Sequence, residues 1–195
     1  MHRADHCVRW LWATHSVHHS SNQFVLANAY RLGWTTQISG TALFVAPLVL
    51  LGFAPSAVLA VLAASLLYQY WIHTELIGRL GPLEWVLNTP AHHRSHHASD
   101  PEYLDRNFGG VLIVFERLFG TFREERADTP CSCGLVQPLA SHNPVRIAFQ
   151  DWIALLRELR TAPGVREAPA IMFGPPGRQS ERDRAAPSRG RVGAG

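Results

Sequence analysis

The residues with the clearest chemistry are histidines, and they follow one pattern twice. His-x2-His-His occurs at residues 15–19 and again at residues 93–97, and a His-x3-His pair at residues 2–6 precedes the first copy. Neutral imidazole binds iron, zinc and copper, and residues three and four apart share one face of a helix. Each block can therefore direct two or three nitrogen atoms at one point, which predicts a metal site.

Together the blocks supply a set of potential ligands that is large for one ion. The members are His2, His6, His15, His18, His19, His93, His96 and His97. A zinc ion takes about four ligands, so this set suits two metal ions better than one. The sequence contains neither the H-E-x-x-H motif of zinc proteases nor the paired Glu-x-x-His of soluble di-iron carboxylate proteins. We therefore predict a histidine-rich centre with two metals.

A long apolar stretch, residues 35–72, separates the two blocks, and no charged residue occurs between Leu32 and His73. As one helix it would reach about 57 Å, nearly twice a hydrocarbon core of about 30 Å. Gly52 and the nearby Pro55 offer a break, so we predict a transmembrane hairpin at 34–73 with helices over 36–51 and 55–72. A buried hairpin in a soluble all-α protein is the alternative. Two spans would return the chain to its starting side, with all histidine blocks on one face.

The remaining segments complete the prediction of an all-α protein. Helices are expected over residues 2–19, 23–34, 111–118 and 144–160, and from Pro90 after a cap at Asn88-Thr89. The predicted fold is an integral membrane helical bundle whose cytosolic helical cap carries the two-metal site. Residues 1–160 form its domain, and residues 161–195, rich in proline, glycine and arginine, are expected to be a disordered tail.

Charge and cysteine content limit the expected partners and the cellular compartment. The net charge of +3 comes from arginine alone, and the arginines are scattered, so nucleic acid is not an expected partner. Basic flanks around the apolar stretch suit the cytoplasmic side of a membrane. Cys7, Cys131 and Cys133 are expected to be incidental thiols in a reducing compartment, and no signal peptide is visible.

The order of these features resembles the fatty acid hydroxylase/sterol desaturase superfamily of membrane di-iron enzymes. Three strings carry the resemblance over roughly residues 2–160: HRADHCVRWLWATHSVHHSS, YWIHTELIGRLGPLEWVLNTPAHHRSHH and YLDRNFGGVLIVFERLFGTF. The second string is most similar to the alkylglycerol monooxygenase-like branch and its bacterial relatives.

The resemblance implies an enzyme in which two iron ions activate O2 to hydroxylate a C–H bond of a lipid, with cleavage of an alkylglycerol ether as one outcome. The lipid would come from the bilayer. Electrons would come from an external donor, either a redox partner protein or a pterin-type reductant, because the sequence contains no flavin or ferredoxin motif. The implied location is a bacterial inner membrane, with the histidine site on the cytoplasmic side.

The resemblance also implies further site residues. His73 and His92 occupy positions where additional histidines complete the coordination; an ordinary interface histidine is the alternative for His73, and His92 could equally be no ligand. Asp105 and Asn107 match a D-x-N element that could orient imidazole N–H groups or cap the next helix, and Glu75 could act similarly. His142 is expected to be structural.

One departure from the family concerns the start of the chain. Members carry further membrane helices before H-x3-H, whereas His2 directly follows Met1, on a first turn whose N–H groups are free. We therefore expect a truncated or miscalled start. The alternative function is a truncated, catalytically inactive metal-binding membrane remnant. A metal transporter is a third option, which the absence of histidine within the predicted spans disfavours.

Overall fold

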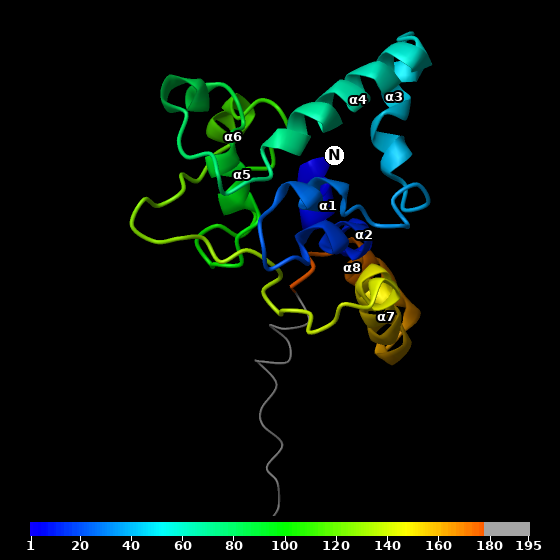
Figure 1. Ribbon diagram of the computed structural model, residues 1–195. Helices are drawn as coiled ribbons and strands as arrows, with labels where there is room; N and C mark the ends of the chain where they lie inside the picture. The colour runs from blue at the N-terminus through cyan, green and yellow to red at the C-terminus, as the bar shows by residue number, and fades with distance from the viewer. Residues whose placement is uncertain (178–195) are drawn as a thin grey trace, which may run out of the picture.

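The computed structural model describes residues 1–177, which are mostly helical, as predicted. The α-helices are α1 (His2–Cys7), α2 (Arg9–His19), α3 (Ala46–Leu50), α4 (Pro55–Trp71), α5 (Pro90–His96), α6 (Val114–Leu118), α7 (Pro144–Thr161) and α8 (Ala168–Phe173). The 3-10 helices are η1 (Leu26–Tyr30), η2 (Thr41–Phe44), η3 (Gly81–Trp85) and η4 (Val165–Glu167). Figure 1 shows α1 and α2 at the centre, α5 and α6 to one side, and α3 and α4 projecting away.

The N-terminal segment forms two helices, so the prediction of one helix over residues 2–19 is wrong. Val8 between them is extended, with φ −114° and ψ 115°. The N–H of Arg9 donates to the carbonyl of Gly174 at 2.9 Å, outside the segment, instead of to the preceding turn. The break lets α1 fold back against α2, so that both helices contribute histidines to one place.

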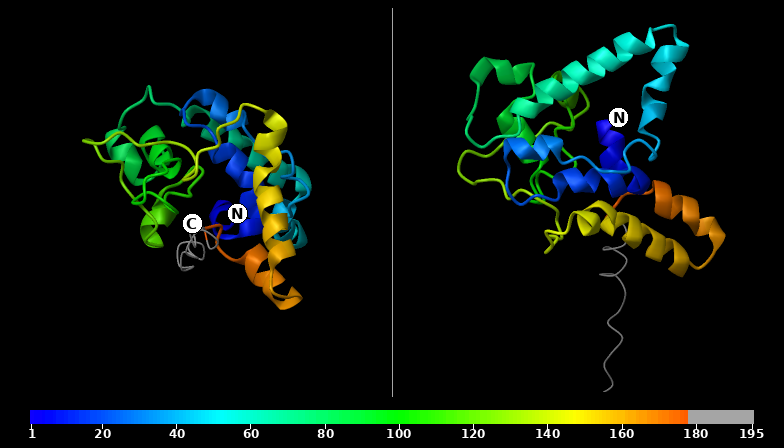
Figure 2. Two further views of the ribbon diagram at one scale, coloured as in Figure 1. Left: turned by 90° about the horizontal axis from the view of Figure 1, so that it is seen from below. Right: turned by 45° about the vertical axis from the view of Figure 1, so that its right-hand side comes forward.

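Helix α2 is held from the opposite side by α7 and α8, which lie beneath it in the right view of Figure 2. Helix α7 begins at the predicted place, where the Asn143 side chain caps it by accepting from the N–H groups of Val145 and Arg146. Trp152 packs edge-on against Trp10 of α2, with ring centroids 4.8 Å apart, and Ile147 and Leu155 are buried. One face of α2 thus meets α7, leaving another for the histidines.

The predicted disorder beyond residue 160 is wrong for residues 161–177. Helix α8 contacts α2 and α7, and its Ile171 is buried. The guanidinium of Arg9 donates to the carbonyl of Pro176 at 2.9 Å, which adds a polar tie to this apolar contact. The rest of the predicted tail, residues 178–195, lies outside the described residues.

The predicted hairpin is realised in one arm only. Helix α4 matches the second arm closely, but the first arm is reduced to η2 and the short α3. Gly40 before η2 and Gly52 after α3 both take left-handed conformations, with φ 93° and 97°. Pro47 sits in the first turn of α3, where its missing N–H allows a helix to begin but not to continue backwards. Among residues 1–177, no helix has both the length and the apolar character that a membrane crossing needs.

Of three shorter predicted helices, two differ from the prediction and one matches it. The helix predicted over residues 23–34 is only the 3-10 helix η1. The helix predicted over residues 111–118 begins later, at Val114. Helix α5 begins at Pro90 after the extended Thr89, as the sequence predicts.

The packing of α7 gives a direct test. Leu155 is 1% exposed, whereas the adjacent Leu156 is 50% exposed. Leu155→Ala should lower the free energy of unfolding by about 2–5 kcal/mol, because it removes buried contacts and leaves a cavity. The matched Leu156→Ala variant should change it by less than about 1 kcal/mol. Urea denaturation of both variants measures the difference, and equal losses would contradict the packing described.

Candidate metal centre

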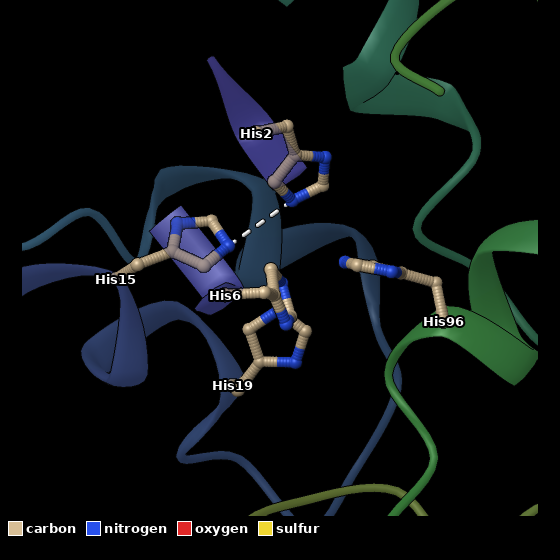
Figure 3. Close-up of side chains that lie close together, drawn as sticks. All are labelled: His2, His6, His15, His19 and His96. Carbon is tan, nitrogen blue, oxygen red and sulfur yellow. Dashed lines mark hydrogen bonds between the residues drawn. The ribbon is translucent and has the colours of Figure 1, made fainter. Parts of the chain in front are cut away.

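Nine of the eleven histidines gather in two adjoining groups. The first group is His2, His6, His15, His19 and His96, and the second is His18, His73, His93 and His97. Within each group, one ring nitrogen of every histidine lies within 4.8 Å of the others. Figure 3 shows the first group, in which His96 approaches from the side opposite the other four rings.

Each His-x2-His-His block divides between the two groups. On α2, His15 and His19 belong to the first group and His18 to the second. On α5 the division is reversed, since the outer two histidines belong to the second group and His96 to the first. Residues four apart share a helix face, and the histidine between them is rotated away from it. Both helices therefore serve both groups, and the rings of His19 and His97 stack 4.2 Å apart where the groups meet.

The other members come from α1 and from the segment just after α4. Helix α1 supplies His2 and His6, and His2 is held by His15 at 3.1 Å between their Nε2 atoms. His73 follows the end of α4, where its Nε2 lies 2.9 Å from that of His93 and 3.2 Å from that of His18. The structure thus places His73 among the potential ligands, as the family resemblance implies.

Backbone carbonyls fix the orientation of three rings. The Nδ1 atoms of His2, His73 and His96 lie 2.7, 2.7 and 2.8 Å from the carbonyl oxygens of Phe108, Gln69 and Arg106. A carbonyl oxygen only accepts, so each Nδ1 carries the proton, and in a neutral ring Nε2 then presents a lone pair. These lone pairs point into the groups.

The arrangement of the ring nitrogens fits metal ions. The Nε2 atoms of His93 and His97 are 3.3 Å apart, in line with the other spacings. Nitrogens bound at about 2.1 Å to one ion stand about 3.0–3.4 Å from their neighbours in octahedral or tetrahedral geometry. The buried Nε2 atoms of His6, His19 and His96 have no hydrogen-bond partner among the described residues. A cation in each group would satisfy these lone pairs.

Burial lowers the pKa values of the grouped histidines, so their rings stay neutral at pH 7. Burial, reinforced by the neighbouring His73 and His2, lowers the pKa of His18 to about 3. Burial likewise lowers the pKa of His2 to about 4, against the opposing effect of the Phe108 carbonyl. Burial also lowers the pKa well below its ordinary value for His6, His15, His19, His93, His96 and His97. Neutral imidazole is the form that binds metal.

Asn107 supports the centre through the backbone of α5. It is fully buried in a left-handed conformation, φ 54°, which asparagine tolerates better than most residues. Its Nδ2 donates to Ser95 Oγ at 2.8 Å and to the Arg123 carbonyl at 2.6 Å. The side chain therefore fixes the helix that bears the histidines, whereas the D-x-N resemblance suggested that it orients an imidazole N–H or caps the next helix, whose N-cap residue is Ile113.

Asp105 and Glu75 lie in different surroundings. A carboxylate oxygen of Asp105 lies 3.8 Å from Nδ1 of His6, which is too far for a hydrogen bond. Glu75 is exposed, and its carboxylate lies beside Cys133, where burial and this charge raise the pKa of the thiol to about 12. Of the two carboxylates, Asp105 is the one that lies near a histidine of the groups.

His92 and His142 stand outside both groups. His92 is buried, packs edge-on against Phe122 with ring centroids 5.2 Å apart, and lines a separate cavity. His142 is exposed in the loop before α7. The structure thus offers no position for His92 as a tenth ligand.

One supporting residue escaped the sequence analysis. Arg94 makes a bidentate pair with Glu125, at 2.8 and 2.7 Å, and also donates to the carbonyls of Thr74 and Ile77. It thereby ties α5 to the segment that follows His73. Its position between His93 and His96 could have revealed this role, because an arginine beside histidines that are expected to be buried needs several hydrogen-bond partners.

Comparison with known proteins agrees with this centre. The sequence profile described as fatty acid hydroxylase matches residues 1–121. The chain belongs to the fatty acid hydroxylase family. It is 40% identical over 177 residues to alkylglycerol monooxygenase of Homo sapiens, covering 90% of this chain and 39% of that protein. The Danio rerio alkylglycerol monooxygenase gives the same identity and coverage.

A more distant relative handles another lipid. The chain is 29% identical over 139 residues to ornithine lipid hydroxylase OlsE of Rhizobium tropici, covering 71% of this chain and 42% of that protein. The chain spans about two fifths of the length of these curated relatives. No solved structure matches it significantly.

Metal content tests the grouping. We expect two ions per chain after anaerobic loading with Fe(II), and a reduced content in His96→Ala and in His73→Ala, which remove a ligand from different groups. His92→Gln should retain both ions, because its ring lies outside the groups. Plasma emission spectrometry of the purified variants measures this. Metal loss in His92→Gln as large as in His96→Ala would refute the assignment.

Acidification should destabilise the metal-free protein. The unfolded chain protonates its histidines near pH 6.5, whereas the folded chain resists protonation, so the unfolded state binds more protons below that pH. For His18, with a folded pKa of about 3, the loss between pH 7 and pH 5 is about 2 kcal/mol. Thermal melts followed by circular dichroism should show Tm falling over this range, with a shallower fall in His18→Gln. An unchanged Tm from pH 7 to pH 5 would contradict the buried neutral histidines.

Proposed function

We propose that the chain carries the catalytic core of a membrane-bound di-iron oxygenase that uses O2 to hydroxylate a C–H bond of a lipid. The observation that carries this proposal is the pair of adjoining groups of neutral imidazoles, shared between α2 and α5. Imidazole nitrogen suits iron, and two groups with five and four ligands suit two ions. Bound iron would supply the redox chemistry that attack on an alkyl C–H bond requires.

The surrounding side chains keep water away from the centre. Phe24 and Phe108 are both buried. The ring of Phe24 lies 5.2 Å from that of His97, and the ring of Phe108 lies 5.3 Å from that of His6. Apolar rings against both groups lower the local dielectric and strengthen metal–nitrogen bonding. This enclosure supports oxygen chemistry, in which stray water causes side reactions.

Tautomer control is the second contribution of the chain itself. The carbonyls of Phe108, Gln69 and Arg106 hold the protons of three rings at Nδ1, away from the centre. The corresponding Nε2 atoms therefore need no deprotonation before they bind a cation. Because these acceptors are backbone atoms, the orientation of the His2 and His96 rings depends on the path of the chain around residues 106–108, and that of His73 on the end of α4.

The lipid part of the proposal rests on the relatives and on the exposed surface. The names of the relatives specify an alkylglycerol and an ornithine lipid. Leu59, Leu66 and Leu67 of α4 are exposed, as are Leu50 and Leu51 at the end of α3. We propose that this apolar surface lies in the bilayer that delivers the substrate, with the metal centre at the cytoplasmic side of a bacterial inner membrane. A redox protein or pterin-type reductant would supply electrons.

Turnover with isotopic oxygen tests the proposal. The iron-loaded chain in lipid nanodiscs should incorporate one atom of ¹⁸O₂ into an alkylglycerol or an aminolipid when a reductant is supplied, as measured by mass spectrometry of the extracted lipids. His96→Ala should lower the rate by more than about 100-fold, because losing a ligand costs more than losing a residue that orients one.

The matched control is His142→Gln, which alters an exposed histidine far in the sequence from the blocks and should keep the full rate. Full iron loading without labelled product from any lipid class would overturn the proposal and support a metal-binding remnant.

A further inference from the structure

A second potential binding site lies outside the histidine groups. A cavity of about 320 Å³ opens between η3, α5 and α6. Its charged and aromatic lining residues are Arg79, Glu84, Trp85, His92, Arg117 and Glu124. Two arginines and two glutamates give the lining no net formal charge, so the cavity offers both positive and negative partners to a ligand.

The positive side of the cavity is centred on Arg117. Its guanidinium is sandwiched between two rings, 4.6 Å from the centroid of Trp85 and 3.7 Å from that of Phe122. One of its terminal nitrogens donates to the Glu84 carbonyl at 3.2 Å. Its Nε is buried without a hydrogen-bond partner among the described residues. Arg79, by contrast, pairs with Glu124 at 2.6 Å. Arg117 is therefore the cation positioned to receive an oxyanion.

The negative side combines carboxylates with a buried ring nitrogen. His92 is 1% exposed, and its Nδ1 has no partner among the described residues. When Nε2 of the neutral ring carries the proton, the unpartnered Nδ1 is an acceptor that is free to receive a hydrogen bond. An unsatisfied buried acceptor costs about 1–3 kcal/mol, so a donor from a ligand would relieve it.

The cavity is bordered by apolar side chains that face outward. Leu83 and Trp85 of η3 and Phe115 and Leu118 of α6 are exposed, Leu118 at 75%. The two elements lie side by side, because the N–H of Ile113 before α6 donates to the Val86 carbonyl after η3 at 2.9 Å. Isolated exposed apolar residues are ordinary, but a cluster around a polar cavity marks an interaction site.

This apolar border adjoins the exposed apolar surface of α4. The hydroxyl of Tyr68 near the end of α4 donates to the Asn88 carbonyl at 2.7 Å, just after η3. Figure 1 and the right view of Figure 2 show η3 and α6 beside the end of α4 that joins the body. A bilayer that contacts α4 would therefore also reach the mouth of the cavity, where lipid headgroups lie.

We propose that this cavity binds the zwitterionic headgroup of a membrane lipid, with its phosphate at Arg117 and its ammonium between His92 Nδ1 and the carboxylate of Glu84. The membrane setting rests on the proposed function, but the charge pattern does not. A purely anionic headgroup would meet the Glu84 carboxylate, and a headgroup without charge would leave the Arg117 guanidinium unmatched. The mixed lining fits both charges of one ligand.

Binding of short-chain lipids tests the proposal without turnover. The full chain, metal-loaded and held in amphipol, is titrated calorimetrically with four probes: dihexanoyl phosphatidylethanolamine, dihexanoyl phosphatidic acid, dihexanoylglycerol and free phosphoethanolamine. Phosphatidylethanolamine should bind at least about tenfold more tightly than the other three, because only it offers phosphate, ammonium and acyl chains together.

Variants separate the two charges. Arg117→Gln should weaken binding of both phosphate-bearing lipids by about tenfold, whereas Arg117→Lys keeps the charge and should retain most of it. Glu84→Gln should remove the preference for phosphatidylethanolamine over phosphatidic acid. Arg166→Gln, at an exposed arginine of η4, is the matched control and should bind as the unaltered chain does. Tm values verify that each variant is folded.

Three results would overturn the proposal: equal binding of dihexanoylglycerol and phosphatidylethanolamine, a preference for phosphatidic acid, or unchanged binding in a folded Arg117→Gln variant. If free phosphoethanolamine bound as tightly as dihexanoyl phosphatidylethanolamine, the cavity would be a site for a soluble ligand, and the lipid proposal would be wrong. A chain that shows the expected selectivity but oxidises no lipid would overturn only the proposed oxygenase activity.

Discussion

The crossing of α2 and α5 is the arrangement on which the rest of the structure depends. Helix α2 carries three of the grouped histidines, and α5 with its C-cap residue His97 carries three more. The 100° step between successive residues sends two of each three to one group and one to the other. Because the division is opposite on the two helices, neither group is complete without both. A small rotation of α5 would disturb both groups together, which explains why Arg94 and Asn107 tie this short helix to three other segments.

The sequence predicted that histidines form a metal site, but it did not predict how those histidines divide between two groups. Spacing alone identified His15, His18 and His19 as potential ligands and suggested two metals, and the family resemblance added His73. The sequence did not reveal that His18 belongs to a different group from His15 and His19, because the grouping depends on where α5 lies. His92 shows the converse limit: it directly precedes a ligand in sequence, yet the helix turns its ring toward Phe122.

The fold departs from prediction where long-range contacts override local pattern. Nothing in residues 2–19 marks Val8 as a break, since the acceptor that takes the N–H of Arg9 lies at Gly174. The same contact orders a segment whose composition predicted disorder. Local signals sufficed where a cap and a proline coincide, as at Thr89-Pro90 and Asn143-Pro144. Helix boundaries set by such pairs are predictable from sequence, and those set by distant carbonyls are not.

Metal binding would be coupled to folding in this architecture, because the grouped histidines occupy the place of a hydrophobic core. Inward-facing lone pairs repel one another, and burial of unpartnered ring nitrogens such as Nε2 of His6 and His19 costs free energy. Helix α1 is too short to be stable alone, and its contacts with α2 include these very rings. A cation in each group would convert this repulsion into attraction, so the free energy of metal binding also stabilises the fold. The centre is therefore part of the core.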